Sequence, residues 1–277
     1  MLKVSELFIY PVKSLSGIPV SSVVVTERGF EYDRRWMLIN ENNRFITQRE
    51  FPSLALLQTQ ITDKGLVVEH KQNHSSFIIP FQPQTNSFIN VHVWSDSCKA
   101  QPVSDLADKW FSDILSFSCR LVFMPDETRR RVDTRYAHNK EITSLSDGFP
   151  FLLIGQSSMN DLNNRLKEKL SVIRFRPNIV FTGGEPYEED RMEHFVVNNI
   201  HFYGVKLCAR CTIPTVDPET AERGKEPSKT LATYRMQRNK IYFGQNLLHT
   251  GEGVISVGDK IEIVKKSEQK FGEDLKD

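Results

Sequence analysis

Short stretches of alternating apolar and polar residues dominate the first hundred positions of the chain. Alternation with a period of two is typical of a half-buried β-strand, because successive side chains point to opposite faces. Turn signals such as Ser16-Gly17 separate the stretches, and many short strands at this spacing predict a barrel or a sandwich. The predicted strands cover 4–11, 20–26, 36–40, 54–61, 66–70 and 76–80.

A helical period interrupts this alternation at 104–114. Ser104 precedes the first apolar position and is a candidate N-cap, because its hydroxyl can accept a hydrogen bond from a free backbone N–H. We expect a boundary between two domains beside this helix, with the first domain covering 1–117. The apolar face of the helix would carry Leu106, Trp110, Phe111 and Ile114.

The second half of the chain mixes both periods. Ser158 and Asp161 resemble a capping box, and the helix that they would start is expected to reach Leu170. The fold class is therefore mainly β with a few helices (α+β), with a second domain at 118–265 and a charged tail at 266–277. Further predictions are an apolar run at 149–154, strands at 178–182 and 201–207, a helix at 228–238, and two short strands within 254–264.

Composition narrows the class of protein. The 277 residues are 39% hydrophobic and 26% charged, which is ordinary for a globular protein of one or two domains. A net charge of +1 gives no general attraction to a nucleic-acid polymer or an anionic membrane. No signal peptide and no apolar run of about 18 residues is apparent. The few cysteines favour a reducing compartment, and we expect the cytoplasm.

Two of the four cysteines stand in Cys208-Ala209-Arg210-Cys211. Arg210 beside a thiol favours the thiolate, which is the form that binds soft metals. Pro214 and Pro218 restrict the following backbone to extended or turn geometry. A single C-x-x-C motif leaves three interpretations open: structural thiols, a metal ligand, or a redox pair.

Cationic and polar residues recur where predicted strands begin or end. Such side chains donate hydrogen bonds to phosphate oxygens, so together they could form an anion site. Taken singly, each could equally be a solvated charge, since most charged residues are exposed. The candidates are Lys13, Ser14, Arg34, Arg176, Asn178 and the loop Ser146-Asp147-Gly148.

These segments, in this order, resemble the MOSC proteins, a family named after the C-terminal domain of molybdenum cofactor sulfurases. Within that family, the pattern resembles the bacterial YcbX-like proteins and the mitochondrial amidoxime-reducing component. The resemblance covers about residues 2–264. It rests on Tyr10-Pro11-Val12-Lys13-Ser14, Asp33-Arg34-Arg35-Trp36, Phe175-Arg176-Pro177-Asn178, the cysteine motif through Val216-Asp217-Pro218, and Phe243-Gly244-Gln245.

The resemblance implies an N-terminal MOSC β-barrel domain, a MOSC β-barrel domain, and molybdenum held by the dithiolene of molybdopterin. Cys211 corresponds to the family's metal ligand, and a soft thiolate suits such a metal. The positions that correspond to the family's cofactor contacts are Lys13, Ser14, Arg34, Ser146, Asp147, Gly148, Arg176, Asn178, Ala209 and Arg210.

The implied activity is a molybdenum-dependent oxidoreductase that reduces small N-hydroxylated compounds. Cys211, Arg210 and Asp217 are the candidate catalytic residues. Arg210 would tune the charge at the metal. Asp217 could deliver protons or stabilise a turn, and an Asp before a Pro favours the turn.

Electrons should come from a separate protein. The four cysteines do not fit an iron–sulfur spacing, and no G-x-G-x-x-G fingerprint appears. We therefore expect a flavoprotein or an iron–sulfur protein as the donor, and no iron–sulfur cluster in this chain. Two other readings stay open: a cofactor or sulfur carrier without turnover, and a structural two-barrel protein with an inert C-x-x-C.

Overall fold

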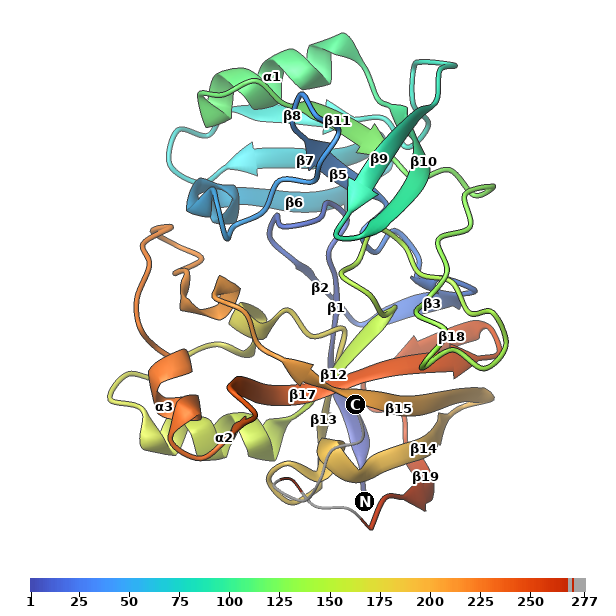
Figure 1. The fold of residues 1–277 in the computed structure, drawn as a ribbon, viewed down its shortest axis with the longest axis vertical. Helices are drawn as coiled ribbons and strands as arrows, with labels where there is room; N and C mark the ends of the chain where they lie inside the picture. Colours follow the sequence, from blue (N-terminus) through green and yellow to red (C-terminus); the bar gives the residue numbers. More distant parts are fainter. Residues whose placement is uncertain (269–270, 272–277) are drawn as a thin grey trace.

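The computed structural model describes residues 1–268 and 271, and shows two bodies stacked along the long axis of the molecule (Figure 1). The mainly β fold class predicted from the sequence is confirmed. The upper body holds the segment from β5 to β11 with helix α1. The lower body holds both ends of the described chain, with α2 and α3 on one side of its largest sheet.

The upper body packs two small sheets around two apolar clusters. Its sheets have the strand orders β5-β11-β10-β9 and β6-β7-β8. Buried Leu38, Leu57, Val68 and Phe111 lie in a common apolar cluster beneath α1. The elements are β5 Trp36–Ile39, η1 Pro52–Leu56, β6 Leu57–Thr62, β7 Gly65–His70, β8 Ser76–Ile79, β9 Ile89–Val93, β10 Asp96–Pro102, α1 Asp105–Leu115 and β11 Arg120–Phe123.

The lower body is built on a nine-stranded sheet of order β19-β14-β15-β17-β12-β13-β1-β2, with β16 beside β17. A second sheet has the order β18-β3-β4. The strands are β1 Lys3–Ile9, β2 Ile18–Val20, β3 Ser22–Thr26, β4 Gly29–Phe30, β12 Phe151–Gly155, β13 Ile179–Thr182, β14 Met192–Val197, β15 Ile200–Ala209, β16 Met236–Gln237, β17 Lys240–Thr250, β18 Gly253–Ser256 and β19 Ile261–Lys266. The helices are α2 Gln156–Arg165, η2 Val172–Phe175, η3 Glu188–Arg191, η4 Ile213–Thr215 and α3 Ser228–Ala232.

The sheets cross the predicted domain boundary at residue 117. Strand β1 pairs antiparallel with β13, with Leu7 opposite Ile179. Strand β3 pairs with β18, with Val24 opposite Val254. Strands β1 to β4 therefore belong to sheets of the lower body, although Val12 and Leu15, between β1 and β2, pack into the core of the upper body.

The predicted N-cap of helix α1 is confirmed, but one residue of its predicted apolar face is exposed. The Ser104 hydroxyl accepts a hydrogen bond from the Ala107 backbone N–H. Leu106, however, is 69% exposed, and the buried positions are Ala107, Phe111 and Leu115. These three recur at intervals of four, so Leu106 stands one position outside the stripe that faces the core.

Other predicted elements were wrong in extent. Pro52 begins a 3₁₀ turn, so β6 starts at Leu57 and not at residue 54. Helix α2 ends at Arg165, before Leu170, and its cap residue is Gly155. The capping box is wrong because the Ser158 hydroxyl donates to Glu189 Oε2 instead. The sequence analysis did not predict strands β9, β10, β11, β14 and β17. Helix α3 covers Ser228–Ala232 and is shorter than the expected helix at 228–238.

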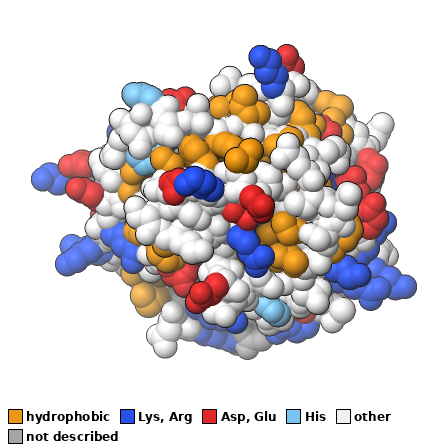
Figure 2. All heavy atoms as spheres, turned by 90° about the horizontal axis from the view of Figure 1, so that it is seen from above, with side chains coloured by type: hydrophobic (Ala, Val, Ile, Leu, Met, Phe, Trp, Pro, Cys, Tyr) orange, Lys and Arg blue, Asp and Glu red, His pale blue; other side chains and the backbone are white. Residues whose placement is uncertain are grey.

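The surface shows no single dominant charge. Seen from above, toward the α1 end, basic and acidic side chains alternate with small apolar patches (Figure 2). No helix in the described part of the chain is long and apolar enough to cross a bilayer. The predicted charged tail at 266–277 lies mostly outside the described residues.

Candidate functional site

A cavity of about 160 Å³ lies between residues of the upper and lower bodies, next to the cysteine motif. The lining contains every residue predicted to bind a cofactor. The predicted residues that line it are Lys13, Ser14, Arg34, Ser146, Asp147, Gly148, Arg176, Asn178, Ala209, Arg210 and Cys211. They come from five chain segments far apart in sequence, which the fold brings together.

Tyr10 forms the base on which two of the arginines rest. Its ring is fully buried, and the guanidinium groups of Arg34 and Arg176 each lie 4.3 Å from the ring centre. Arg34 also donates to Asp33 Oδ2 at 2.6 Å and to Asn178 Oδ1 at 3.0 Å. These contacts fix Arg34 at the point where three segments meet.

Backbone strain is concentrated at the same place. Ser14, Arg34 and Arg176 have φ angles of 70°, 49° and 58°, in the left-handed region that side chains seldom adopt. Such conformations persist where the surrounding structure holds them, and they cluster at functional sites. Backbone hydrogen bonds hold two of the three, since Arg34 N donates to Tyr10 O at 2.8 Å and Arg176 N donates to Ile173 O at 3.0 Å.

Lys13 and Arg49 share the carboxylate of Asp147. Lys13 Nζ lies 2.6 Å from Oδ1, and Arg49 Nη2 lies 2.9 Å from Oδ2. Burial lowers the pKa of Lys13 to about 8, although Asp147 opposes this. Burial would raise the pKa of Asp147, but Lys13 and Arg49 outweigh it and hold that pKa far below its usual range.

Arg130 fixes the loop that carries Asp147. It is nearly fully buried and donates to the carbonyl oxygens of Ser144, Ser146 and Asp147 at 2.9, 2.7 and 3.1 Å. One guanidinium therefore binds three backbone oxygens of the same loop. The loop is held in place by a side chain that does not line the cavity.

Arg49 is the site residue that the sequence analysis missed. It lies in the loop between β5 and η1 and lines the cavity. Burial would lower the pKa of Arg49, but Asp147 and Cys211 outweigh it and raise that pKa. The sequence signal was weak, because Arg49 follows the polar pair Thr47-Gln48 and adjoins no predicted strand.

The two cysteines of the motif have different neighbours. Arg210 Nη1 donates to Cys208 Sγ at 3.0 Å, and its Nη2 donates to Phe175 O at 2.9 Å. The hydrogen bond of Arg210 thus goes to Cys208, and the arginine whose pKa responds to Cys211 is Arg49. Both thiols are free and only partly buried. Within the described residues, no three His, Cys, Asp or Glu side chains are grouped to hold a metal.

Asp217, a predicted catalytic residue, does not line this cavity. Its Oδ1 accepts the backbone N–H groups of Glu219 and Thr220 at 2.8 and 3.1 Å. Its other oxygen pairs with Arg174. This is the geometry of an Asx turn, which stabilises the loop after the cysteine motif.

Several buried guanidinium nitrogens at the cavity have no hydrogen-bond partner. They are Arg49 Nε and Nη1, Arg176 Nη2, and Arg210 Nε. A buried donor without a partner is costly, and arginine cannot relieve that cost by losing its proton near neutral pH. The arrangement therefore suits an anionic ligand that accepts hydrogen bonds from several sides.

Comparison with known proteins identifies the family of this chain. The chain matches the model of the MOSC N-terminal beta barrel domain over residues 1–118 and that of the MOSC domain over residues 140–262. It is 32% identical to mouse "Mitochondrial amidoxime-reducing component 1", over 94% of this chain and 82% of that protein. It is also 32% identical to human "Mitochondrial amidoxime reducing component 2", over 84% of this chain and 72% of that protein.

Among solved structures, the YuaD protein of Bacillus subtilis aligns over 97% of this chain and 98% of its own, with 10% identity and a TM-score of 0.39. The sequence matches span both halves of the chain and include the segments that line the cavity. The chain belongs to the MOSC-domain family that includes the mitochondrial amidoxime-reducing components.

Proposed function

We propose that this protein is a molybdenum–molybdopterin-dependent reductase of N-hydroxylated compounds. The observation that carries the proposal is the group of unpartnered guanidinium donors around Cys211. The names of the relatives supply the substrate class, because they are called amidoxime-reducing components.

The residues present fit such a cofactor. Molybdopterin carries a phosphate, and Arg34, Arg176 and Lys13 offer cationic donors around one cavity. Cys211 would be the single protein thiolate on the metal, and a dithiolene would add two further sulfur ligands. When bound, the molybdenum centre supplies the two-electron chemistry that removes the oxygen of an N–O group.

The side chains of this protein would set the electrostatics of that site. Arg49 would bring a positive charge toward Cys211, which contributes to the raised pKa of the arginine. Asp147 offsets part of the positive charge through Lys13 and Arg49. The buried ring of Tyr10 lies against the guanidinium groups of Arg34 and Arg176 and excludes water there. Their charges therefore act at short range with little screening.

Each turnover requires two electrons, and we propose that a separate flavoprotein or iron–sulfur protein delivers them. The sequence contains no G-x-G-x-x-G fingerprint through which a nicotinamide dinucleotide would bind. We place the protein in the cytoplasm, a reducing compartment that suits its free thiols.

The decisive experiment uses the chain purified from a host that makes molybdopterin. Metal and pterin analysis should find both, and an amidoxime should be reduced with a viologen as electron source. NADH or NADPH alone should give no turnover until a donor protein is added. Bound cofactor without turnover would favour a carrier, and absence of both metal and pterin would contradict the proposal.

A further inference from the structure

Residues 129–140 carry five basic side chains and one acidic side chain, although the whole chain has a net charge of only +1. They belong to the connection from β11 to β12, which Figure 1 shows in light green as it passes from the upper body to the lower body. Val132 N donates to Glu141 O at 2.9 Å and closes this stretch into one loop. The loop therefore concentrates positive charge in a protein that is close to neutral overall.

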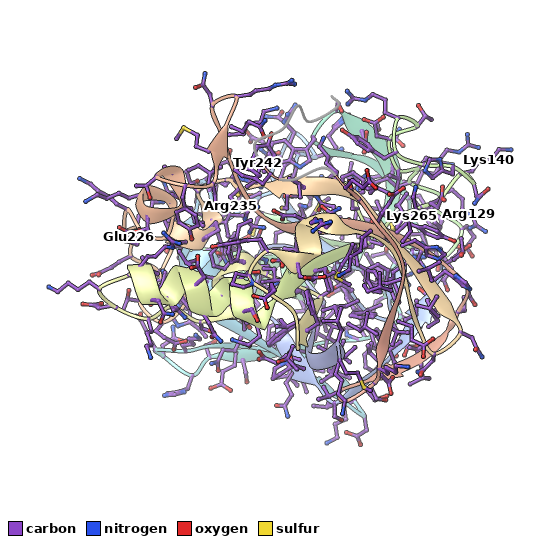
Figure 3. The ribbon with its side chains drawn as sticks, turned by 90° about the horizontal axis from the view of Figure 1, so that it is seen from below. Arg129, Lys140, Glu226, Arg235, Tyr242 and Lys265 are labelled. Atoms are coloured by element: carbon purple, nitrogen blue, oxygen red, sulfur yellow. The ribbon has the colours of Figure 1, made fainter. Side chains whose placement is uncertain are left out.

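Two of the five basic residues of this loop have partners in the fold. Arg129 pairs with Glu27, and Arg130 is buried against backbone oxygens. Asp133, the acidic residue of the loop, offsets the charge of Arg135. Figure 3 shows Arg129 and Lys140 at the same edge of the molecule. The three basic residues of the loop that are exposed are Arg131, Arg135 and Lys140.

This loop reaches the rim of the Cys211 cavity through aromatic contacts. The Tyr136 ring meets the Phe149 ring edge to face at 5.5 Å, and Phe149 lines the cavity. Lys206 Nζ lies 4.6 Å from the centre of the Tyr136 ring. Lys206 is exposed and stands on β15, three residues before Ala209, which also lines the cavity. We define the basic rim as the exposed cations Arg131, Arg135, Lys140 and Lys206.

Exposed cations are often only solvated, but the position of the basic rim argues for a partner. The cavity beside it is where the proposed reaction needs electrons, and a donor protein has to bring its redox centre close to Cys211. Acidic side chains around that redox centre would be attracted to the basic rim, and the attraction would orient the donor toward the cavity. The net charge of the whole chain gives no comparable attraction elsewhere.

We propose that the basic rim is the docking surface for an acidic electron-donor protein. This proposal rests on the proposed function for its need of electrons. Two one-electron donors are oxidised in each turnover, and their electrons, with two protons from solvent, convert one N–OH group to N–H and water. The rim residues do not line the cavity, so the docking surface can be changed while the Cys211 site stays intact.

A plant-type [2Fe–2S] ferredoxin, which is a small acidic one-electron carrier, serves as the probe. Chemically reduced ferredoxin should support the reduction of an amidoxime. Its kcat/KM should fall about ten- to hundredfold between about 20 mM and about 300 mM salt, because salt screens the attraction between exposed charges. Ferredoxin with amidated carboxylates should lose that salt dependence.

Charge reversal separates docking from the chemistry at the metal. Lys206→Glu combined with Arg131→Glu should lower kcat/KM for ferredoxin about ten- to hundredfold at low salt. The rate with reduced methyl viologen, which is a cation, should not fall. Lys206→Met keeps apolar bulk against Tyr136 and should give a smaller loss. Lys169→Glu, at an exposed lysine beyond α2, is the control and should leave both rates unchanged.

Binding supplies the readout that needs no turnover. Oxidised ferredoxin should bind the wild type in calorimetric titration at low salt, and should bind the double variant at least about tenfold more weakly. Such binding in a protein that reduces no amidoxime with viologen would uphold the docking surface and refute the proposed reductase.

Three results would overturn the docking surface. Viologen-driven turnover without ferredoxin binding would do so and leave the reductase standing. Ferredoxin binding that is equal in the wild type and the Lys206→Glu, Arg131→Glu variant would place the donor elsewhere. Binding to vesicles of anionic phospholipid that is tighter than binding to ferredoxin, and that the same variant abolishes, would assign the basic rim to a membrane surface instead.

Discussion

Two buried polar regions of this protein differ in which hydrogen-bonding groups they leave without a partner. The first is the Cys211 cavity, where Arg49, Arg176 and Arg210 retain unpartnered donors. The second is the α2 network, which we define as Ser158, Asp161, Tyr187, Glu189, Asp190 and Arg235. Figure 3 shows Arg235 and Tyr242 close together beside α2, where Arg235 Nε donates to Tyr242 O at 3.1 Å.

The groups left over in the α2 network are acceptors. Arg235 pairs with Asp190 at 2.7 Å, and Ser158 donates to Glu189 at 2.7 Å, but one oxygen of each carboxyl has no partner. Burial raises the pKa of Asp190, and it raises that of Glu189 to about 7. A proton from solvent can therefore remove the charge of the carboxyl that carries the spare oxygen.

Spare guanidinium donors have no such remedy. Burial lowers the pKa of Arg176, helped by the charge of Arg34, but only to about 10, so the group remains charged near neutral pH. Its unused donor needs an acceptor brought from outside the chain. Unpartnered donors thus mark a ligand site, whereas unpartnered acceptors mark a structural network, although both regions are buried and charged.

The largest effect is expected at the cysteine motif. Cys211→Ser should lower turnover by more than about a hundredfold and alter the spectrum of the metal, because the hydroxyl is a poor ligand for a soft metal. Cys208→Ser is the matched control, since its hydroxyl can still accept the hydrogen bond from Arg210. Normal turnover and bound molybdenum in the Cys211→Ser protein would show that the ligand is misassigned.

Glu189→Gln tests the claim that a proton completes the α2 network. The pKa of Glu189 is raised by burial from 4.5 to about 7, so its stabilisation is present below pH 4.5 and lost as pH rises through 7. Over that window the free energy of unfolding of the wild type should fall by about 3 kcal/mol.

In Glu189→Gln that fall should disappear, because the amide is neutral at every pH. Urea denaturation at pH 5 and pH 8 measures it. Glu222→Gln, at an exposed glutamate, is the control and should behave as the wild type does. If the wild type were equally stable at both pH values, Glu189 would not be the proton-binding member of the network.

Arg176→Met tests the donor surplus of the cavity. It removes the charge but keeps apolar bulk above Tyr10. Affinity for molybdopterin should fall roughly ten- to hundredfold, the loss of one charge-assisted hydrogen bond of about 1.5–3 kcal/mol. Arg165→Met removes a guanidinium that pairs with Asp161 on α2 and should change cofactor content little. Equal losses of cofactor in the two variants would contradict the idea that only the Cys211 cavity has donors that need a ligand.

The smallest effect concerns pH and Lys13. Burial lowers its pKa to about 8, so the amine is charged below that pH and loses its charge as pH rises through it. Binding of inorganic phosphate to the cofactor-free protein should weaken above pH 8, by less than about tenfold because the arginines keep their charge. Lys13→Arg should move the decline to higher pH. Calorimetric titration with phosphate at pH 7 and pH 9 distinguishes the wild type from Lys13→Arg. Identical binding curves for the two proteins would remove Lys13 from the anion site.

Local sequence determined the parts of this protein that depend on neighbouring residues. Ser104 could be recognised as a cap because its partner, the Ala107 N–H, is three residues away. The first strand was expected close to its observed place, Lys3–Ile9, although its burial does not alternate, since Leu7, Phe8 and Ile9 are all buried. The motif segments of the family also stand in the sequence itself, and they include the residues that line the cavity.

Only the tertiary structure decided how those segments meet. Lys13 and Asp147 are 134 positions apart, and nothing local to either residue indicates their contact. Ser158 looks like a helix cap in sequence, yet its hydroxyl binds Glu189 from another segment. Arg49 resembles any solvated arginine until the fold places it between Trp94, Asp147 and Cys211. Periodicity reports burial along one element, whereas a charged site depends on which loops the sheets bring together.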